Sequence, residues 1–378
     1  MNFVALRMLT GDRAKYLGLV FAIAFSTFLL ENQTSIFAGI MSRTGNQISD
    51  VTEAEVWVMD PQTVYFEETK ALKDTDLNRV RGVPGVEWAV RLFKGGPVAR
   101  TAAGKFSQCV VLGLDDATLV GVPRKMLMGA WSRLREPNSV IIDKAGYMLL
   151  FPGEPLEIGR TLELNDHLAR IVGISDASAG FVSFPIIHAR YSEAVNFQGR
   201  ERSQMSFIVA RQQSGLTPKQ LCDRIAEQTG LRARTREEFR WDCIRYYLAN
   251  TGIPVNFGIT ITIALIVGTV VAGQTFYLFT VENLKQFGAL KAIGVTNWRL
   301  MGMILLQACT VGAIGFSLGT GMAAVFFEVT SKQIATRGLV LMWECAALTA
   351  ACIFFVVIVA SVLSIRRVLV LEPAAVFR

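Results

Sequence analysis

Four long apolar runs alternate with polar segments along the chain. The runs Tyr246–Val281 and Leu300–Phe327 contain no Asp, Glu, Lys or Arg. Each exceeds the roughly 20 apolar residues that a helix needs to cross a bilayer. Two further runs cover residues 17–40 and 341–365, each interrupted by one glutamate. The pattern therefore predicts a membrane protein with four transmembrane α-helices, the second over 246–281 and the third over 300–327.

Cationic residues flank these runs asymmetrically. Before the first run and between the second and third they outnumber acidic residues: Arg7, Arg13, Lys15, Lys285, Lys291 and Arg299 stand against Asp12 and Glu282. Positive residues beside membrane helices stay on the cytoplasmic side. We therefore expect a multi-pass protein of the cell inner (plasma) membrane with both termini cytoplasmic. A cleaved signal peptide is the competing interpretation of the first run, but we find no clear small-x-small cleavage site.

The segment 41–245 has ordinary charge density and many short strand-like runs, which predicts one large α+β domain. About two hundred residues suffice for a core of its own. Lying between the first two membrane helices, it should be extracytoplasmic. Its expected strands include Phe106–Leu114 and Ser139–Asp143, and a meander begins at Pro155. Expected helices are Asp74–Val80, with Asp74 as N-cap, and Pro218–Gln228, opened by Thr217.

The remaining segments are short. Residues 1–16 suggest a cytoplasmic amphipathic helix, 328–340 an outer loop and 366–378 a cytoplasmic tail. Pro254 marks a helix start or a kink near the top of the second membrane helix. We place aromatic side chains just before that helix at the membrane interface, namely Trp241, Tyr246 and Tyr247.

Each of the polar and small residues inside the membrane segments has two possible roles, one functional and one structural. Glu31 and Glu344 could be functional, but we expect them to be solvated or paired near the outer ends of their helices. Glycines at four-residue spacing in the third run allow close helix contact, and we favour packing within one subunit over a dimer seam. These are Gly312, Gly315, Gly319 and Gly321.

Residues 282–299 form a short segment of mixed polar and apolar residues between the second and third apolar runs. Leu284, Phe287 and Leu290 recur at helical spacing and predict one apolar stripe with lysines beside it. Such a helix has two natural partners, the lipid surface or a groove in a soluble protein. An ordinary interfacial loop helix explains the pattern equally well.

The run from Phe287 to Gly294, FGALKAIG, resembles the motif E-F-x-x-L-K-A-I-G of MacB/FtsX-type ABC permeases, with Gln286 where the family often has Glu. The segment Asn138–Ile174 resembles the periplasmic domain of that family, and the ending LVLEPAAVFR resembles its C-terminus. The length and the absence of a fused ATPase look most like the DevC branch. In the family this stretch is a coupling helix that docks on the ATPase, which implies a coupling site of Leu284, Lys285, Phe287, Gly288, Leu290, Lys291, Ile293 and Gly294.

The resemblance also implies a function. The chain would be the permease subunit of an exporter, a homodimer paired with separate ABC ATPase subunits that bind ATP and Mg. A periplasmic adaptor and an outer-membrane channel are further partners of such systems. The alternative that the family offers is FtsX-like signalling, in which the same layout regulates periplasmic proteins without transport. Haem, lipids, glycolipids and peptides all fit an apolar pathway as substrates.

Composition and motifs exclude several other classes. The chain has 378 residues, 52% hydrophobic and only 18% charged, which is too apolar for a typical soluble protein. Its net charge of +7 lies largely at the ends of apolar runs, so we do not expect nucleic-acid binding. No phosphate loop, metal-binding spacing or catalytic motif is evident, so we expect no catalysis, metal or cofactor in this chain. A disulfide among Cys109, Cys222 and Cys243 stays open.

Overall fold

The computed structural model describes residues 2–199, 205–334 and 336–370. The chain divides into two compact units, a membrane unit of Met1–Gly39 with Gly252–Arg378, and an α+β unit of Ile40–Thr251. The helices of the membrane unit are α1 (Asn2–Gly11), α2 (Arg13–Arg43, whose last turn belongs to the α+β unit), α9 (Ile253–Glu282), α10 (Leu284–Ala292), α11 (Asn297–Thr330) and α12 (Trp343–Val370).

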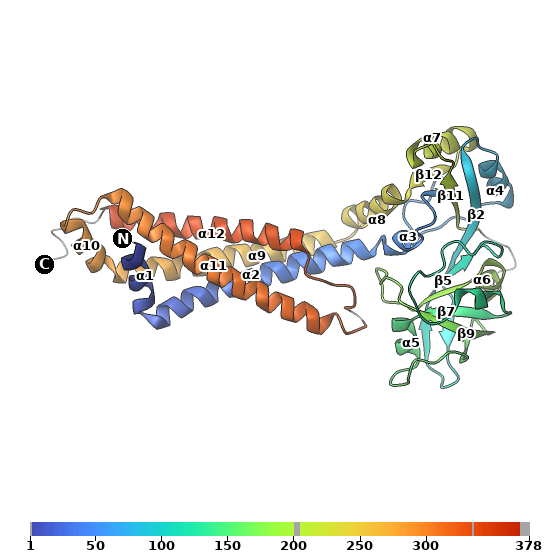
Figure 1. Ribbon diagram of the computed structural model, residues 1–378, viewed down its shortest axis with the longest axis horizontal. Helices are drawn as coiled ribbons and strands as arrows, with labels where there is room; N and C mark the ends of the chain where they lie inside the picture. The colour runs from blue at the N-terminus through green and yellow to red at the C-terminus, as the bar shows by residue number, and fades with distance from the viewer. Residues whose placement is uncertain (1, 200–204, 335, 371–378) are drawn as a thin grey trace. The chain divides into compact units, whose positions relative to one another are not determined.

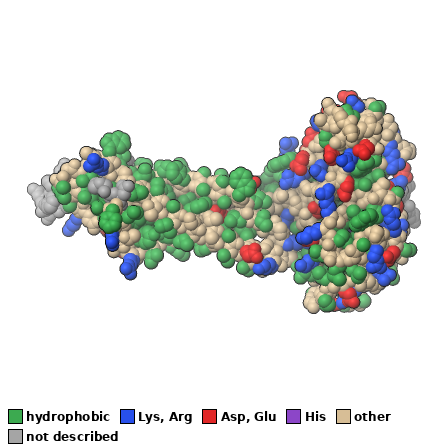
Figure 2. Space-filling model, viewed as in Figure 1, with side chains coloured by type: hydrophobic (Ala, Val, Ile, Leu, Met, Phe, Trp, Pro, Cys, Tyr) green, Lys and Arg blue, Asp and Glu red, His purple; other side chains and the backbone are tan. Residues whose placement is uncertain are grey.

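Four of these helices, α2, α9, α11 and α12, are long and apolar enough to cross a membrane. The predicted fold class, four transmembrane helices with a large α+β domain between the first and the second, is confirmed. The helices run side by side in Figure 1. Hydrophobic side chains cover much of the face of this bundle seen in Figure 2, whereas charged side chains gather on the α+β unit. A belt of apolar side chains around a helix bundle suits contact with lipid.

Glycines allow the helices of the bundle to pack closely against one another. An added Cβ at Gly315 would lie 2.7 Å from Ile23 of α2, and one at Gly319 would lie 2.5 Å from the carbonyl oxygen of Ala24. Gly312 faces Val357 of α12 in the same way, at 2.9 Å. Packing within one subunit is therefore confirmed for these three glycines. Gly321 has open space around it.

The polar side chains of the bundle correct one expectation. Glu31 is fully buried rather than solvated or ion-paired near the end of its helix. Its carboxylate accepts a hydrogen bond from Thr320 of α11, which packs closely on α2 at Gly315 and Gly319. Glu344, in contrast, is exposed.

The second membrane helix begins later than the apolar run. Helix α8 (Arg236–Asn250) ends before Thr251 and Gly252, and α9 begins at Ile253 with Pro254 in its first turn. Proline lacks the N–H that a helix interior requires, and its ring is suited to the first turn. One helix over 246–281 is therefore wrong, and Pro254 is a helix start. The third helix begins at Asn297, before the expected residue 300.

Tyr246 and Tyr247 also differ from expectation. Tyr246 stacks on Tyr65 with ring centroids 3.8 Å apart, and Tyr247 packs on Phe181 at 4.5 Å. Both rings therefore pack against other aromatic side chains within the α+β unit. Tyrosine at the end of an apolar run fits a packed aromatic cluster as well as a membrane interface, and only tertiary contacts distinguish the two.

The α+β unit is built on one mixed sheet with the strand order β12-β1-β11-β2-β5-β10-β7-β9-β8-β3-β4, and β6 pairs with β9. Its strands are β1 (Val56–Met59), β2 (Val86–Gly95), β3 (Val98–Arg100), β4 (Phe106–Gln108), β5 (Val110–Leu114), β6 (Met126–Gly129), β7 (Ser139–Asp143), β8 (Thr161–Leu164), β9 (His167–Ser175), β10 (Ile186–Arg190), β11 (Phe207–Gln212) and β12 (Arg232–Thr235). Most pairs are antiparallel, but β5 with β10 and β7 with β9 are parallel.

Helices lie at both ends of this sheet in Figure 1, with α7 near β11 and β12, α4 near β2, and α5 and α6 near β5, β7 and β9. The helices of the unit are α3 (Asn46–Asp50), α4 (Asp74–Arg81), α5 (Lys144–Leu150), α6 (Tyr191–Phe197), α7 (Pro218–Thr229) and α8. An aromatic core of Trp57, Phe66, Phe207 and Phe239 joins α8 to the sheet. The unit therefore has a hydrophobic core of its own.

Local expectations in the α+β unit were partly right. Helix α7 begins with the predicted Thr217 cap, which forms a reciprocal capping box with Gln220. In α4, Lys73 rather than Asp74 occupies the N-cap position, and Asp76 caps the backbone N–H of Lys73. The strand expected over 106–114 is two strands, because the Cys109 N–H bonds to the carbonyl of Pro97 and interrupts the pairing.

The cysteines considered for a disulfide are buried and free. Cys109, Cys222 and Cys243 lie in three different hydrophobic clusters of the α+β unit. Burial raises the pKa of the Cys222 thiol to about 12, so this thiol stays protonated and unreactive at neutral pH. The three residues act as small apolar core residues, and none of them pairs with another.

Candidate functional site

Helix α10 forms the link between α9 and α11 and is the element on which the sequence places the site. The Asn283 side chain donates a hydrogen bond to the Phe279 carbonyl at the end of α9, with N···O 2.8 Å. At the other end, the Gly294 N–H donates to Lys291 and the Val295 N–H donates to Leu290. These two bonds form a Schellman motif, which requires the left-handed φ of 96° that Gly294 adopts. Both ends of α10 are therefore fixed.

The apolar stripe of α10 faces the other helices of the membrane unit. Phe287 is 0% exposed and belongs to the same core as Phe279 of α9 and Met303 of α11. Leu284 and Leu290 are half-buried and pack against that core, and Gly288 is buried. The burial of Phe287 contradicts the expectation that this side chain fills a groove of another protein, whereas the same expectation for Leu284 and Leu290 stays a prediction. Sequence periodicity identified the apolar face, but which surface covers that face depends on tertiary structure.

A different set of side chains is exposed around α10. Ile293 is 82% exposed and Trp298, in the first turn of α11, is 80% exposed. Lys285 and Gln286 are exposed on the outer face of α10, while Lys291 is half-buried and has interaction partners. We call Lys285, Gln286, Ile293 and Trp298 the α10 surface. The sequence stretch contains Trp298, but helical spacing did not select it, since it lies beyond the turn at Gly294.

A cleft of about 580 Å³ lies next to the α10 surface. Helix α1 contributes Phe3, Val4, Arg7 and Met8 to its wall, and the α9–α10 junction contributes Glu282, Asn283 and Gln286. Lys15 spans the cleft, since its ammonium pairs with Asp12 at 2.7 Å and also with Glu282. The hydrogen bonds of Lys15 hold the pKa of the Asp12 carboxyl below its usual value.

Helix α1 is attached to the bundle by a buried polar contact. The Gln307 side chain of α11 donates a hydrogen bond to the Ala5 carbonyl, with N···O 2.7 Å. Ala5 and Leu9 are buried in the same core as Phe287. The exposed residues of α1 are accordingly on its other face, with Phe3 and Leu6 among them. The expected N-terminal amphipathic helix is thus tied to the same end of the bundle as α10.

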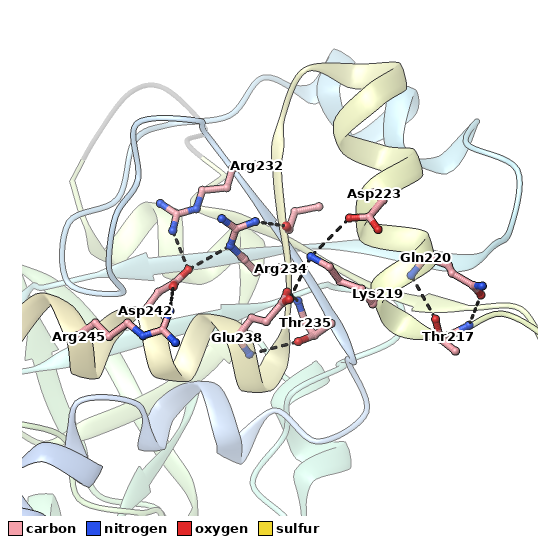
Figure 3. Close-up of polar contacts among 11 residues, drawn as sticks. Thr217, Lys219, Gln220, Asp223, Arg232, Arg234, Thr235, Glu238, Asp242 and Arg245 are labelled. Atoms are coloured by element: carbon pink, nitrogen blue, oxygen red, sulfur yellow. Dashed lines mark hydrogen bonds and ion pairs between the residues drawn. The ribbon is translucent and has the colours of Figure 1, made fainter.

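A network of charged residues fixes α8 within the α+β unit (Figure 3). The Asp242 carboxylate pairs with Arg232 at 2.7 Å and with Arg234 at 3.1 Å, both on β12. Lys219 of α7 pairs with Glu238 of α8 at 3.1 Å. We call these residues the α8 clamp. Together with the buried Phe239, which lies three residues before Asp242 on α8, the clamp holds this helix against the sheet.

Few groups suited to chemistry lie close together. Within the ranges that the structure describes, no group of three or more His, Cys, Asp or Glu side chains is placed to hold a metal ion. The adjacent carboxylates Asp115 and Asp116 have separate structural roles: Asp115 accepts hydrogen bonds from Thr118, and Asp116 accepts them from Ser192 at the start of α6. This pair is therefore not a catalytic dyad.

Comparisons with known proteins agree with this layout. The model of the MacB-like periplasmic core domain matches residues 16–228, and that of the FtsX-like permease C-terminal region matches residues 258–373. Two uncharacterized ABC transporter permeases, from two strains of Mycobacterium tuberculosis, are 23% identical over 308 residues, which cover 80% of this chain and 78% of theirs.

Solved structures match the α+β unit weakly. The periplasmic region of MacB from Actinobacillus actinomycetemcomitans has a TM-score of 0.39 and 14% identity, and covers 54% of this chain and 96% of that one. The extracellular domain of the noncanonic ABC-type transporter YknZ from Gram-positive bacteria has a TM-score of 0.36 and 14% identity, and covers 48% and 98%.

The periplasmic core model alone covers more than half of the chain, and the permease model covers the three membrane helices that follow it. A permease of this kind is the membrane component of a transporter whose other component is an ATPase subunit. The chain therefore belongs to the MacB/FtsX-like family of ABC transporter permeases and is a multi-pass membrane protein.

Proposed function

We propose that the chain is the permease subunit of an ABC-type exporter and that its ATPase is a separate chain, as in the DevC branch. Two copies pair with two ATPase subunits, which bind the ATP and Mg. Family membership supports the ATPase partner, and the sequence offers no phosphate loop of its own. In this arrangement the protein lies in the inner membrane with both termini and α10 in the cytoplasm.

The contact with the ATPase forms on the α10 surface. The observation that carries this proposal is the contrast between Phe287, which is fully buried, and Ile293 and Trp298, which are about four-fifths exposed. Tryptophan is enriched among the residues that contribute most to protein interfaces, and a charged side chain such as Lys285 suits the polar rim of such a contact. Phe287 then acts as an internal anchor, because any displacement of α10 moves a side chain packed among α9 and α11.

The α+β unit is the moving part on the outer side. The α8 clamp makes α8 one body with the sheet, and α8 is joined to α9 by only Thr251 and Gly252. A shift of α9 caused by the ATPase is thus passed to the domain along the chain. Domain movement drives export of a substrate from the outer leaflet or the periplasm, with an adaptor and an outer-membrane channel as further partners.

The test uses the permease in lipid nanodiscs with its partner ATPase. Ile293→Asp places a charge at the centre of the α10 surface, so we expect ATPase binding to weaken at least tenfold, about 1.4 kcal/mol. Val182→Asp alters a residue of the α+β unit that is also exposed and serves as the control. Unchanged binding by Ile293→Asp, measured by titration of the labelled ATPase, contradicts the proposed contact.

Orientation and transport are tested separately. A cysteine at Gln286 is expected to react with a membrane-impermeant maleimide only from the cytoplasmic side. Reconstituted vesicles with the ATPase and candidate cargo then show whether ATP drives movement of a substrate. ATP-dependent domain movement without any cargo transport assigns the chain to FtsX-like signalling instead.

A further inference from the structure

Glu31 is an ionisable side chain in the interior of the helix bundle. It lies in the C-terminal half of α2 and is 0% exposed. One carboxylate oxygen, Oε1, accepts a hydrogen bond from the Thr320 hydroxyl of α11, with O···O 2.8 Å. The other, Oε2, is buried and has no hydrogen-bond partner within the described ranges. A buried acid with an orphaned oxygen in a membrane helix is unusual and costly, so it requires an explanation.

Helices α2 and α11 pack closely beside Glu31, whose side chain has no exposed area. Along the seam between α2 and α11, Gly315 approaches the carbonyl oxygen of Val20, and Gly319 approaches that of Ala24; added Cβ atoms would lie 3.1 Å and 2.5 Å from these oxygens. Thr320 follows Gly319 directly, so the same close approach places its hydroxyl on Glu31. The position of the Thr320–Glu31 bond thus depends on the closed seam.

The groups that face Glu31 are neutral. Thr320 is the residue of α11 bonded to it, and on α2 the Ser35 hydroxyl, one turn further on, is buried without a partner of its own. The nearby hydroxyls of Thr27 and Thr34 donate to backbone carbonyls of α2. Within the part of the chain that the structure describes, no ion pair joins Glu31 to Lys, Arg or His.

An ionised carboxylate in this position would lack compensation. Burying an unpaired charge costs more free energy than a single hydrogen bond to that charge returns. A bound proton removes the charge and converts the orphaned oxygen into a hydroxyl. It also needs no space, which suits a seam that is closed by backbone contacts at Gly315 and Gly319.

We propose that Glu31 is a proton-binding site that is occupied while α2 and α11 are packed together and empties when this seam opens to water. Binding and packing are then linked, and each favours the other by the same free energy. Acidic conditions stabilise the closed seam, and loss of the proton favours the open one. The permease thereby gains a response to pH that does not depend on the proposed ATPase contact.

Infrared spectroscopy of the full-length permease in nanodiscs, with ¹³C-labelled glutamate, tests the site. The difference spectrum between the wild type and Glu31→Gln at pH 7 is expected to contain the carbonyl band of a protonated carboxylic acid. Glu344→Gln, which alters an exposed glutamate, is the control and is expected to leave that band in place. A difference spectrum without the band overturns the proposal.

Two glycine variants of α11 test whether proton binding at Glu31 depends on the packing of α2 against α11. Gly319→Ala forces the seam apart, whereas Gly321→Ala meets nothing within 4 Å. We expect Gly319→Ala to lower the pH at which the Glu31 band disappears by at least one unit, a tenfold weaker proton affinity, and Gly321→Ala to leave it unchanged. Both variants retain Glu31, so this comparison stands even if Glu31→Gln does not fold. If the Glu31 band disappears at the same pH in both variants, the link between proton binding and packing is overturned.

Replacing Na⁺ and K⁺ by N-methylglucamine distinguishes a proton from a metal cation. We expect neither the band nor the melting temperature to change. A requirement for Na⁺ or K⁺, together with an ionised Glu31, overturns the proposal and assigns the site to that cation.

Discussion

Two side chains of the membrane unit, Phe287 and Glu31, are buried by residues that are distant in the sequence. Helical spacing predicts the apolar face that contains Phe287, and the structure turns that face inward; Glu31, expected to be solvated or paired, is buried against Thr320. Helical spacing shows which side chains share a face and says nothing about what covers it. Burial of a side chain that is distant in sequence from its neighbours, such as Glu31 beside Thr320, therefore requires the tertiary structure.

His188 on β10 makes the α+β unit sensitive to acid. It is buried, its Nδ1 has no hydrogen-bond partner among the described residues, and it lines a cavity of about 120 Å³. Burial lowers the pKa of His188 to about 4, against about 6.5 in the unfolded chain. Below pH 6.5 the unfolded state binds a proton that the folded state does not, so stability falls as the pH drops from 6.5 towards 4.

We therefore expect the free energy of unfolding to decrease by up to about 3 kcal/mol over that pH range. His188→Leu is expected to remove this decrease, and His167→Leu, at an exposed position, is expected to retain it. Urea denaturation of both variants at pH 7 and pH 4.5 measures the effect. An equal loss of stability in wild type and His188→Leu would show that another group is responsible.

The sequence predicted which helices and strands exist better than it predicted where each of them begins and ends. Helix α7 has the predicted cap, and β7 has the predicted bounds, because both are encoded by neighbouring residues. The division of 106–114 into β4 and β5 depends on a bond from Cys109 to Pro97. The apolar run over 246–281 shows no break between α8 and α9, and Pro254 is the residue in it that indicates a helix start. Local signals fix caps and turns, whereas strand breaks depend on which partner strand is present.

The α8 clamp predicts a measurable effect on one element. Asp242 has a side chain only 17% exposed and pairs with two arginines of β12, so Asp242→Asn is expected to cost about 1–2 kcal/mol. Asp223→Asn is the matched control: Asp223 is well exposed and, among the residues that the structure describes, pairs only with Lys219, so we expect a loss below about 0.5 kcal/mol.

Hydrogen exchange of the α8 backbone amides provides the readout. In Asp242→Asn these amides are expected to exchange faster than in the wild type, while those of β7 stay protected. Equal protection of α8 in Asp242→Asn and Asp223→Asn would mean that the buried Phe239 alone holds the helix in place.

For the whole molecule, the sequence was most informative. Long apolar runs and flanking charges predicted the four membrane helices and the position of the α+β domain, since a lipid-embedded chain must satisfy its backbone bonds within helices. The coupling site on the loop between α9 and α11 stays a prediction, and the sequence motif includes only part of the residues that are exposed there. Ile293 and Lys285 were included, whereas Trp298 was not.

The division into two units predicts independent folding of the larger one. Residues 40–251 have separate aromatic and aliphatic cores that include Trp57, Tyr147 and Leu221. We expect this segment, produced alone, to be monomeric and to unfold in one cooperative transition in urea. Circular dichroism and ultracentrifugation measure this. An aggregated or molten segment would show that the membrane helices are needed to complete its core.

The inward position of Phe287 has a consequence for how such permeases choose among several ATPases in one cell. The side chain that anchors α10 and the exposed side chains that we propose for the ATPase contact are different residues. Ile293 and Trp298 can therefore be exchanged for those of a second permease without disturbing the interior of the bundle. When these two positions carry the residues of the second permease, this chain is expected to bind the ATPase of that permease. It is expected to keep its own preference for cargo.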